Sequence, residues 1–158
     1  MMIQLLLLWL SFIAPSAESN KVQTISLEQL QSSTIQNNDT LYVVNFWATW
    51  CKPCVAEMPY FEEANTKFAS QKVKVVFVSL NYPRELAAVD KFVKQKKIQS
   101  TAYLLDAGTP NSWIDKIEKE WGGSIPATIL YKNGKKVFFR EGEFTQIELD
   151  SIIKTKIQ

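Results

Sequence analysis

Cys51 and Cys54 are the only cysteines in the 158-residue sequence, and Lys52 and Pro53 separate them. Two sulfurs at this spacing could form a structural disulfide, half of a metal site, or a disulfide that opens and closes during a reaction. A structural disulfide that closes so short a loop would stabilise the fold only weakly. A zinc or copper site needs more ligands than two thiolates, and the sequence has no histidine to supply them. We therefore predict a redox-active pair and no metal.

The cysteines lie between a predicted strand and a predicted helix. Residues 41–47 (LYVVNFW) are nearly all apolar, as in a strand buried on both faces. Pro53 suits the first turn of a helix, which we expect over residues 53–70 with a kink at Pro59. The N-terminal end of a helix stabilises negative charge, and Lys52 adds positive charge. We expect these effects to lower the pKa of the Cys51 thiol below its free value of about 8.5, with Cys54 deeper and less exposed.

The remaining pattern predicts an α/β domain with a mixed central sheet and helices on both faces. Lys132 to Lys135 contain an Asn-Gly hairpin turn. We expect further helices over residues 24–36, 83–97, 112–121 and 145–157, and further strands over residues 73–80, 102–105, 127–131 and 137–140.

The first 19 residues resemble an export signal. Residues 3–14 form an apolar run that is too short to span a bilayer comfortably, and small residues follow it. No lysine or arginine precedes the run, so an uncleaved N-terminal anchor is an alternative. We therefore expect a signal peptide or anchor over residues 1–19, one domain over residues 20–158, and a periplasmic or cell-envelope location, where disulfides persist.

The overall composition excludes several classes of function. The formal net charge is only +2, too weak to predict nucleic acid as a partner. The absence of histidine excludes a Ser-His-Asp triad and a histidine general base.

The sequence around the cysteines resembles the thioredoxin-fold family. Residues 44–54 (VNFWATWCKPC), followed by Glu57 and Pro59, are similar to its exported TlpA/ResA branch of thiol–disulfide oxidoreductases. The resemblance covers residues 22–158 and implies a thioredoxin fold with the helix–strand insertion of this branch, over residues 84–105. It also implies that Pro126, after Ile125, is the cis-proline that packs against the disulfide and helps to bind substrate backbone. Ala127 replaces the usual threonine, which puts details of the substrate contact in doubt.

Two polar residues refine the expected chemistry. Asn45 occupies the strand position where cytoplasmic thioredoxins carry a buried aspartate, and an amide cannot take up the proton of Cys54. Glu57, one helical turn after Cys54, is the residue expected to do so, although a solvated helix carboxylate is the alternative. Trp50 is our candidate for an exposed platform that contacts substrate.

We expect Cys51 to attack a substrate protein disulfide and Cys54 to resolve the mixed disulfide, without a cofactor. The resemblance implies a reductant in cytochrome c maturation or related redox homeostasis, with a membrane thiol transporter as electron donor, and we expect a monomer. An oxidant, a peroxidase and a non-catalytic metal or cofactor carrier are the alternatives. Two features count against them: Ala48 stands where a peroxidase would have threonine, and the CxxxC spacing and distant histidine of a copper carrier are missing.

Overall fold

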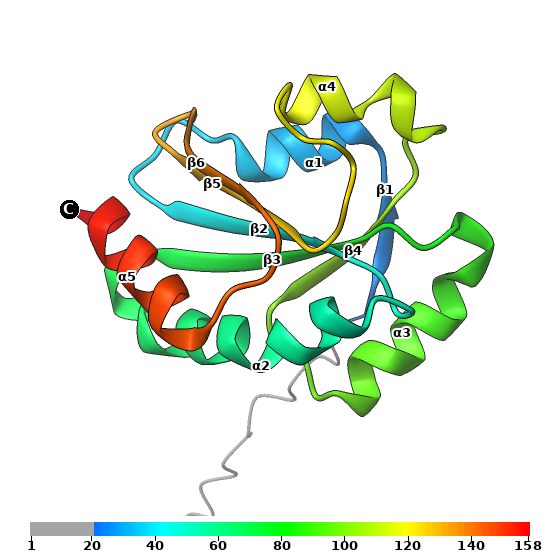
Figure 1. Cartoon of the computed structure of the whole chain (residues 1–158), viewed down its shortest axis with the longest axis horizontal. Coiled ribbons are helices and arrows are strands. Elements are labelled where there is room, and N and C mark those ends of the chain that lie inside the picture. Colours follow the sequence, from blue (N-terminus) through cyan, green and yellow to red (C-terminus); the bar gives the residue numbers. More distant parts are fainter. Residues whose placement is uncertain (1–20) are drawn as a thin grey trace, which may run out of the picture.

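A computed structural model describes residues 21–158, and the expected signal peptide or anchor over residues 1–19 lies outside these described residues. Six strands form one sheet in the order β1-β4-β3-β2-β5-β6. The four adjacent strands β1, β4, β3 and β2 are parallel to one another. β5 pairs with β2 and β6 pairs with β5, both antiparallel (Figure 1). The strands are β1 (Gln23–Ile25), β2 (Leu41–Trp47), β3 (Val73–Ser79), β4 (Thr101–Leu105), β5 (Ala127–Lys132) and β6 (Lys135–Glu141).

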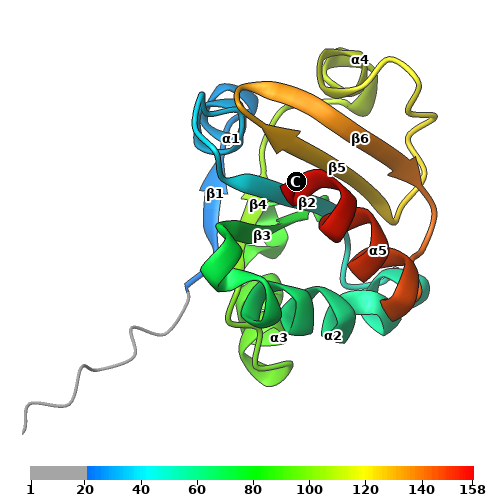
Figure 2. The same cartoon turned by 90° about the vertical axis from the view of Figure 1, so that its left-hand side faces the viewer.

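Helices cover both faces of this sheet. In two perpendicular views, α2, α3 and α5 lie on one face, and α1 and α4 lie on the other (Figures 1 and 2). The helices are α1 (Leu27–Thr34), α2 (Lys52–Lys67), α3 (Leu86–Gln95), α4 (Ile114–Ile117) and α5 (Gln146–Ile157). Short 3-10 turns at Ala69–Gln71, Pro83–Glu85 and Pro110–Ser112 follow or precede them. The architecture is a thioredoxin fold, in which α3 and β4 form the expected insertion.

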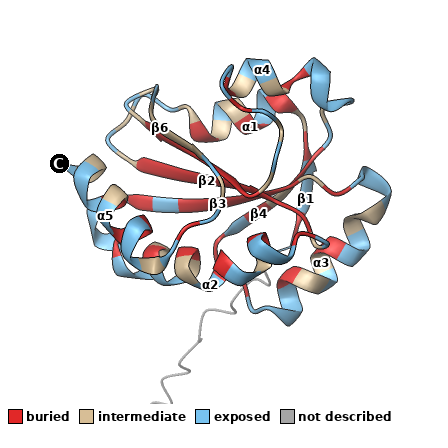
Figure 3. Cartoon of the chain, in the orientation of Figure 1, coloured by how far each residue is buried: buried red, intermediate tan, exposed pale blue. Residues whose placement is uncertain are grey.

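The core has two apolar layers, one on each face of the sheet. Every residue of β2 is buried, as expected for a central strand covered on both sides (Figure 3). Met58 and Phe61 of α2 pack in the layer beneath the sheet, and Trp113 and Trp121 pack in the layer above it. The cysteine-bearing helix α2 is thus anchored in the larger layer through its buried side chains.

Local sequence determines where several elements begin. Ser26 and Thr145 each close a capping box, with Gln29 and Glu148 as the reciprocal partners, at the starts of α1 and α5. The predicted Asn-Gly turn joins β5 to β6, and both Asn133 and Gly134 have positive φ values, 52° and 70°.

Two predicted helices differ from the structure. The helix expected from residue 24 begins only at Leu27, because Gln23–Ile25 pair with β4 as an edge strand. The helix expected over residues 112–121 was wrong for most of its length, since α4 ends at Ile117 and Glu118 is extended. The Glu118 carboxylate pairs with Lys136 of β6.

Between residues 21 and 158, none of the helices combines the length and the apolar character needed to cross a membrane.

Candidate active site

The two cysteines form a disulfide at the start of α2, with their Cα atoms 5.3 Å apart. Cys51 is the N-cap residue of the helix, and its Sγ accepts a hydrogen bond from the Cys54 backbone N–H at 3.3 Å. This sulfur therefore occupies the position where free backbone donors and the helix dipole favour negative charge. The predicted junction of strand, cysteine pair and helix is present, and Pro53 lies in the first turn.

The two cysteine residues differ in exposure. Cys54 is fully buried, while Cys51 is 5% exposed. Trp50, immediately before Cys51, is 67% exposed, and Lys52 and Pro53 are also exposed. A molecule that approaches from solvent can therefore reach Cys51 before Cys54, and it meets the Trp50 ring beside it.

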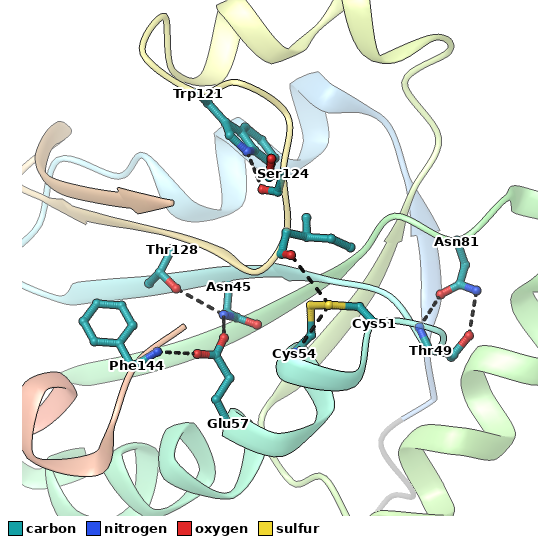
Figure 4. Close-up of a disulfide and its surroundings, with 11 residues drawn as sticks. Asn45, Thr49, Cys51, Cys54, Glu57, Asn81, Trp121, Ser124, Thr128 and Phe144 are labelled. Atoms are coloured by element: carbon teal, nitrogen blue, oxygen red, sulfur yellow. Dashed lines mark hydrogen bonds between the residues drawn. A yellow bond between two sulfur atoms is a disulfide. The ribbon is translucent and has the colours of Figure 1, made fainter. Parts of the chain in front are cut away.

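A loop from the opposite layer lies against the disulfide. The Ile125–Pro126 peptide bond is cis, and the Ile125 carbonyl oxygen lies 3.7 Å from Cys51 Sγ (Figure 4). The Cys51 thiol could donate a hydrogen bond to this oxygen when the disulfide is reduced. Trp121 Nε1 donates to the Ser124 carbonyl at 2.8 Å, which fixes the approach of the loop to the sulfurs.

Glu57 is a buried carboxylate one helical turn beyond Cys54, with only 1% exposure. Its Oε1 accepts a hydrogen bond from Asn45 Nδ2 at 2.9 Å, and its Oε2 accepts one from the Phe144 backbone N–H at 2.7 Å (Figure 4). Burial raises the pKa of Glu57 to about 7, although both hydrogen bonds act to lower it. The carboxyl group can therefore gain and lose a proton near neutral pH.

Charged groups near Glu57 come from β6 and the loop after it. Glu143 raises the pKa of Glu57 and Arg140 lowers it. Both residues line a surface cavity of about 320 Å³ that also has Glu57, Phe144 and Glu148 in its wall. Arg140 forms an ion pair with Glu148 at 3.2 Å, so a second carboxylate offsets part of the positive charge that faces Glu57.

The sequence interpretation missed three partners of the site. Thr128 Oγ1 accepts a hydrogen bond from Asn45 Nδ2 at 3.1 Å, and Phe144 contributes only its backbone N–H to Glu57. Asn81, two positions after β3 ends, forms hydrogen bonds with both the backbone N–H and the hydroxyl of Thr49. Thr128 could have been found from the alignment of β2 with β5, whereas the backbone contact of Phe144 has no sequence signal.

A metal site is not formed by the described part of the chain. Across residues 21–158, no three Cys, Asp, Glu or His side chains are grouped so that they could bind a metal ion.

Comparison with known proteins agrees with this geometry. Residues 12–139 match the AhpC/TSA family. The chain belongs to this family. Within it, the chain is 37% identical over 146 residues to the thiol-disulfide oxidoreductase ResA of Oceanobacillus iheyensis, an alignment that covers 89% of this chain and 71% of that protein.

Solved structures of similar proteins have the same fold. StoA from Bacillus subtilis is 26% identical, with a TM-score of 0.58, and the match covers 74% of this chain and 84% of StoA. A thiol:disulfide interchange protein of the thioredoxin family from Chlorobium tepidum is 25% identical, with a TM-score of 0.63 and coverage of 77% and 82%. The chain is thus a thioredoxin-like thiol–disulfide oxidoreductase of the ResA type.

Proposed function

We propose that the protein is an exported reductant of protein disulfides, with Cys51 as the nucleophile and Cys54 as the resolving thiol. The observation that carries the proposal is that Cys51 is 5% exposed and Cys54 is fully buried, in a disulfide at the start of a helix. Only Cys51 is accessible, and its sulfur lies where a thiolate is stabilised.

The reaction begins with the reduced protein. The Cys51 thiolate attacks one sulfur of a substrate disulfide, forming a mixed disulfide and releasing the other substrate sulfur as a thiolate. Cys54, after losing its proton, attacks the Cys51 sulfur and releases the second substrate thiolate. The substrate has then gained two electrons, and the protein is left with the Cys51–Cys54 disulfide. A dithiol donor, which the resemblance suggests is a membrane thiol transporter, must return two electrons before the next cycle.

Glu57 is proposed to accept the proton of Cys54. The carboxylate lies on the same helix one turn away, and its pKa of about 7 suits proton transfer near neutral pH. Ionised Glu57 is the competent base, so the rate of the resolving step should rise as the pH increases through about 7. Glu57→Gln should remove this dependence, and an unchanged pH–rate profile would eliminate Glu57 from the mechanism.

Ile125 and Pro126 are proposed to bind the backbone of the substrate beside Cys51, and Trp50 to contact its side chains. The ResA relatives and the envelope location expected from residues 1–19 favour a substrate in cytochrome c maturation. The protein is proposed to act as a monomer.

Trapping tests the proposal directly. In Cys54→Ser, the mixed disulfide cannot be resolved, so Cys51 should remain joined to its physiological partners, which mass spectrometry can identify. Cys51→Ser is the matched control and should trap nothing. Apocytochromes c among the trapped proteins would support the maturation pathway, and a set without them would refute it. Failure of the wild-type protein to accelerate insulin reduction by dithiothreitol would overturn the enzymatic function itself.

A further inference from the structure

The segment from Gly122 to Ser124 leads into the contact with the disulfide. It is irregular, its first and last residues are exposed, and Gly123 has a positive φ of 90°. Two glycines in succession give the backbone many accessible conformations. The next residue, Ile125, nevertheless places its carbonyl oxygen 3.7 Å from Cys51 Sγ. Contacts from elsewhere in the chain must therefore fix this segment.

One carboxylate binds both ends of the segment. Glu141 Oε2 accepts a hydrogen bond from the Gly122 backbone N–H at 3.0 Å, and its Oε1 accepts one from the Ser124 backbone N–H, also at 3.0 Å. The hydrogen bond from Gly122 lowers the pKa of Glu141, so the group is ionised at neutral pH. A hydrogen bond to an ionised acceptor is about twice as strong as a neutral one. Glu141 thus closes the turn around Gly123.

The end of β6 also holds the chain on the other side of the contact. Glu141 is the last residue of β6 and pairs with Ala127 of β5. The backbone N–H of the next residue, Gly142, donates to the Pro126 carbonyl at 2.8 Å. The chain is therefore bound before Ile125 by the Glu141 side chain and after it by the Gly142 backbone.

Trp121 provides a second anchor for Ser124. Its Nε1 donates to the Ser124 carbonyl (Figure 4), while Glu141 binds the Ser124 N–H, so hydrogen bonds hold the backbone on both sides of this residue. The two anchors differ in burial. The Trp121 ring is buried against Phe46 and Phe139, whereas Glu141 is exposed. Glu141 can therefore be replaced without a change in the core.

We propose that Glu141 is a positioning residue for disulfide exchange, whose carboxylate holds the Gly122–Ser124 turn and thereby places Ile125 and Pro126 beside Cys51. The inference rests on the proposed binding of substrate backbone by Ile125 and Pro126. A turn that moves freely presents these residues correctly for only part of the time, and the apparent affinity for substrate falls by that fraction. Loss of the Glu141 carboxylate should therefore weaken substrate binding and leave the chemical step nearly unchanged.

Two substitutions remove the proposed contact to different degrees. Glutamine has a single carbonyl oxygen, so Glu141→Gln keeps the size of the side chain but can accept from only one of the two backbone N–H groups. Glu141→Ala removes both hydrogen bonds. Because the position is exposed, both variants should fold, which urea denaturation checks.

Amide hydrogen exchange of the oxidised protein, followed for each residue by NMR, tests the contact itself. In wild type, the Gly122 and Ser124 amides should be protected although both residues are exposed, because Glu141 accepts their hydrogen bonds. In Glu141→Ala, protection at these two amides should fall several-fold, while protection within β2 stays the same. Wild-type protection of both amides in Glu141→Ala would overturn the proposal.

Reduction of insulin by dithiothreitol, catalysed by the full chain, tests the effect on the reaction. Glu141→Gln should raise KM for insulin several-fold while kcat changes little. Glu120→Gln is the matched control, because it removes the same charge from an exposed position just before the turn, and it should keep the wild-type KM. A wild-type KM in Glu141→Gln, or an equal rise of KM in Glu120→Gln, would overturn the proposal.

The same measurements separate the inference from the proposed function. If the wild-type protein does not accelerate insulin reduction, the proposed function fails, whatever the amide protection of the variants. If the wild-type protein is active and Glu141→Gln has the same KM, the proposed function stands and only the inference fails.

Discussion

Thr49 and Asn81 are joined by two hydrogen bonds, although they are 32 positions apart in sequence. The Thr49 backbone N–H donates to Asn81 Oδ1 at 3.0 Å, and Asn81 Nδ2 donates to the Thr49 hydroxyl at 2.8 Å. The pair connects the segment before Cys51 to the end of β3, where the α3 insertion begins. The segment that leads into Cys51 is therefore held by a residue outside the cysteine motif.

Asn81→Ala should loosen this segment. The variant loses the two hydrogen bonds to Thr49 and those of the same side chain to Ser79 and Glu85, so the free energy of unfolding, measured by urea denaturation, is expected to fall by about 1–3 kcal/mol. Alkylation of Cys51 in the reduced variant should have an altered rate, because the N-cap geometry is less fixed. Asn111→Ala, at an exposed position, is the matched control. Equal behaviour of the two variants would show that Asn81 does not position Cys51.

Glu57→Gln should change how stability depends on pH. The pKa of Glu57 is about 7 in the folded protein, against an ordinary value of 4.5, so the folded state binds the proton more tightly than the unfolded chain. Its contribution is fully present below pH 4.5 and is lost as the pH rises through about 7, a difference of about 3 kcal/mol in the free energy of unfolding. Urea denaturation across this range should show the loss in wild type and not in Glu57→Gln.

The control for this measurement is Glu63→Gln, which removes an exposed carboxylate from the same helix. This variant should keep the wild-type slope of stability against pH. A slope that survives in Glu57→Gln would assign it to another group.

The two capping boxes provide a matched pair of variants. Ser26→Ala and Thr145→Ala should each lower the free energy of unfolding by about 1 kcal/mol. Only Thr145→Ala should also shift the Glu57 midpoint upward, because Thr145 orders the helix start beside the Phe144 N–H that stabilises the Glu57 carboxylate. Urea denaturation measures the change in stability, and an NMR titration of the Glu57 carboxyl carbon measures its midpoint. An equal Glu57 midpoint in the two variants would contradict the predicted effect of Thr145 on Glu57.

Trp50→Ala should reduce activity without reducing stability. The ring is 67% exposed, so little apolar burial is lost, but a protein substrate at Cys51 would lose a contact. We expect kcat/KM for insulin to fall several-fold while the rate with a small aromatic disulfide changes little. Ile147→Ala, 81% exposed on α5, should leave both rates as they are. A uniform loss with both substrates would instead indicate a disturbed disulfide.

Sequence patterns predicted the elements whose signals are local. The β2–cysteine–α2 junction and the Asn-Gly hairpin both follow from neighbouring residues. β1 could not be predicted, because three residues form a strand only through pairing with β4. The early end of α4 at Ile117 was not predicted either, and the Glu118 carboxylate that follows it pairs with a residue of a later strand.

The residues of the candidate site also fall into two groups, those that local sequence predicts and those that it does not. The positions of the two cysteines and Glu57 were found because they repeat at helical spacing in one segment. Asn81 and Thr128 were missed because their place beside the site depends on the pairing of distant strands.

The hydrogen bond from Phe144 to Glu57 has an evolutionary consequence. Its donor is a backbone N–H, so a substitution at position 144 leaves the donor in place unless the new residue is proline. The side chain at this position can therefore drift under packing constraints alone. Substitutions at Phe144, whose buried ring packs edge-on against Phe61, would be limited by packing, whereas substitutions at Asn45 would also remove a hydrogen bond to the carboxylate.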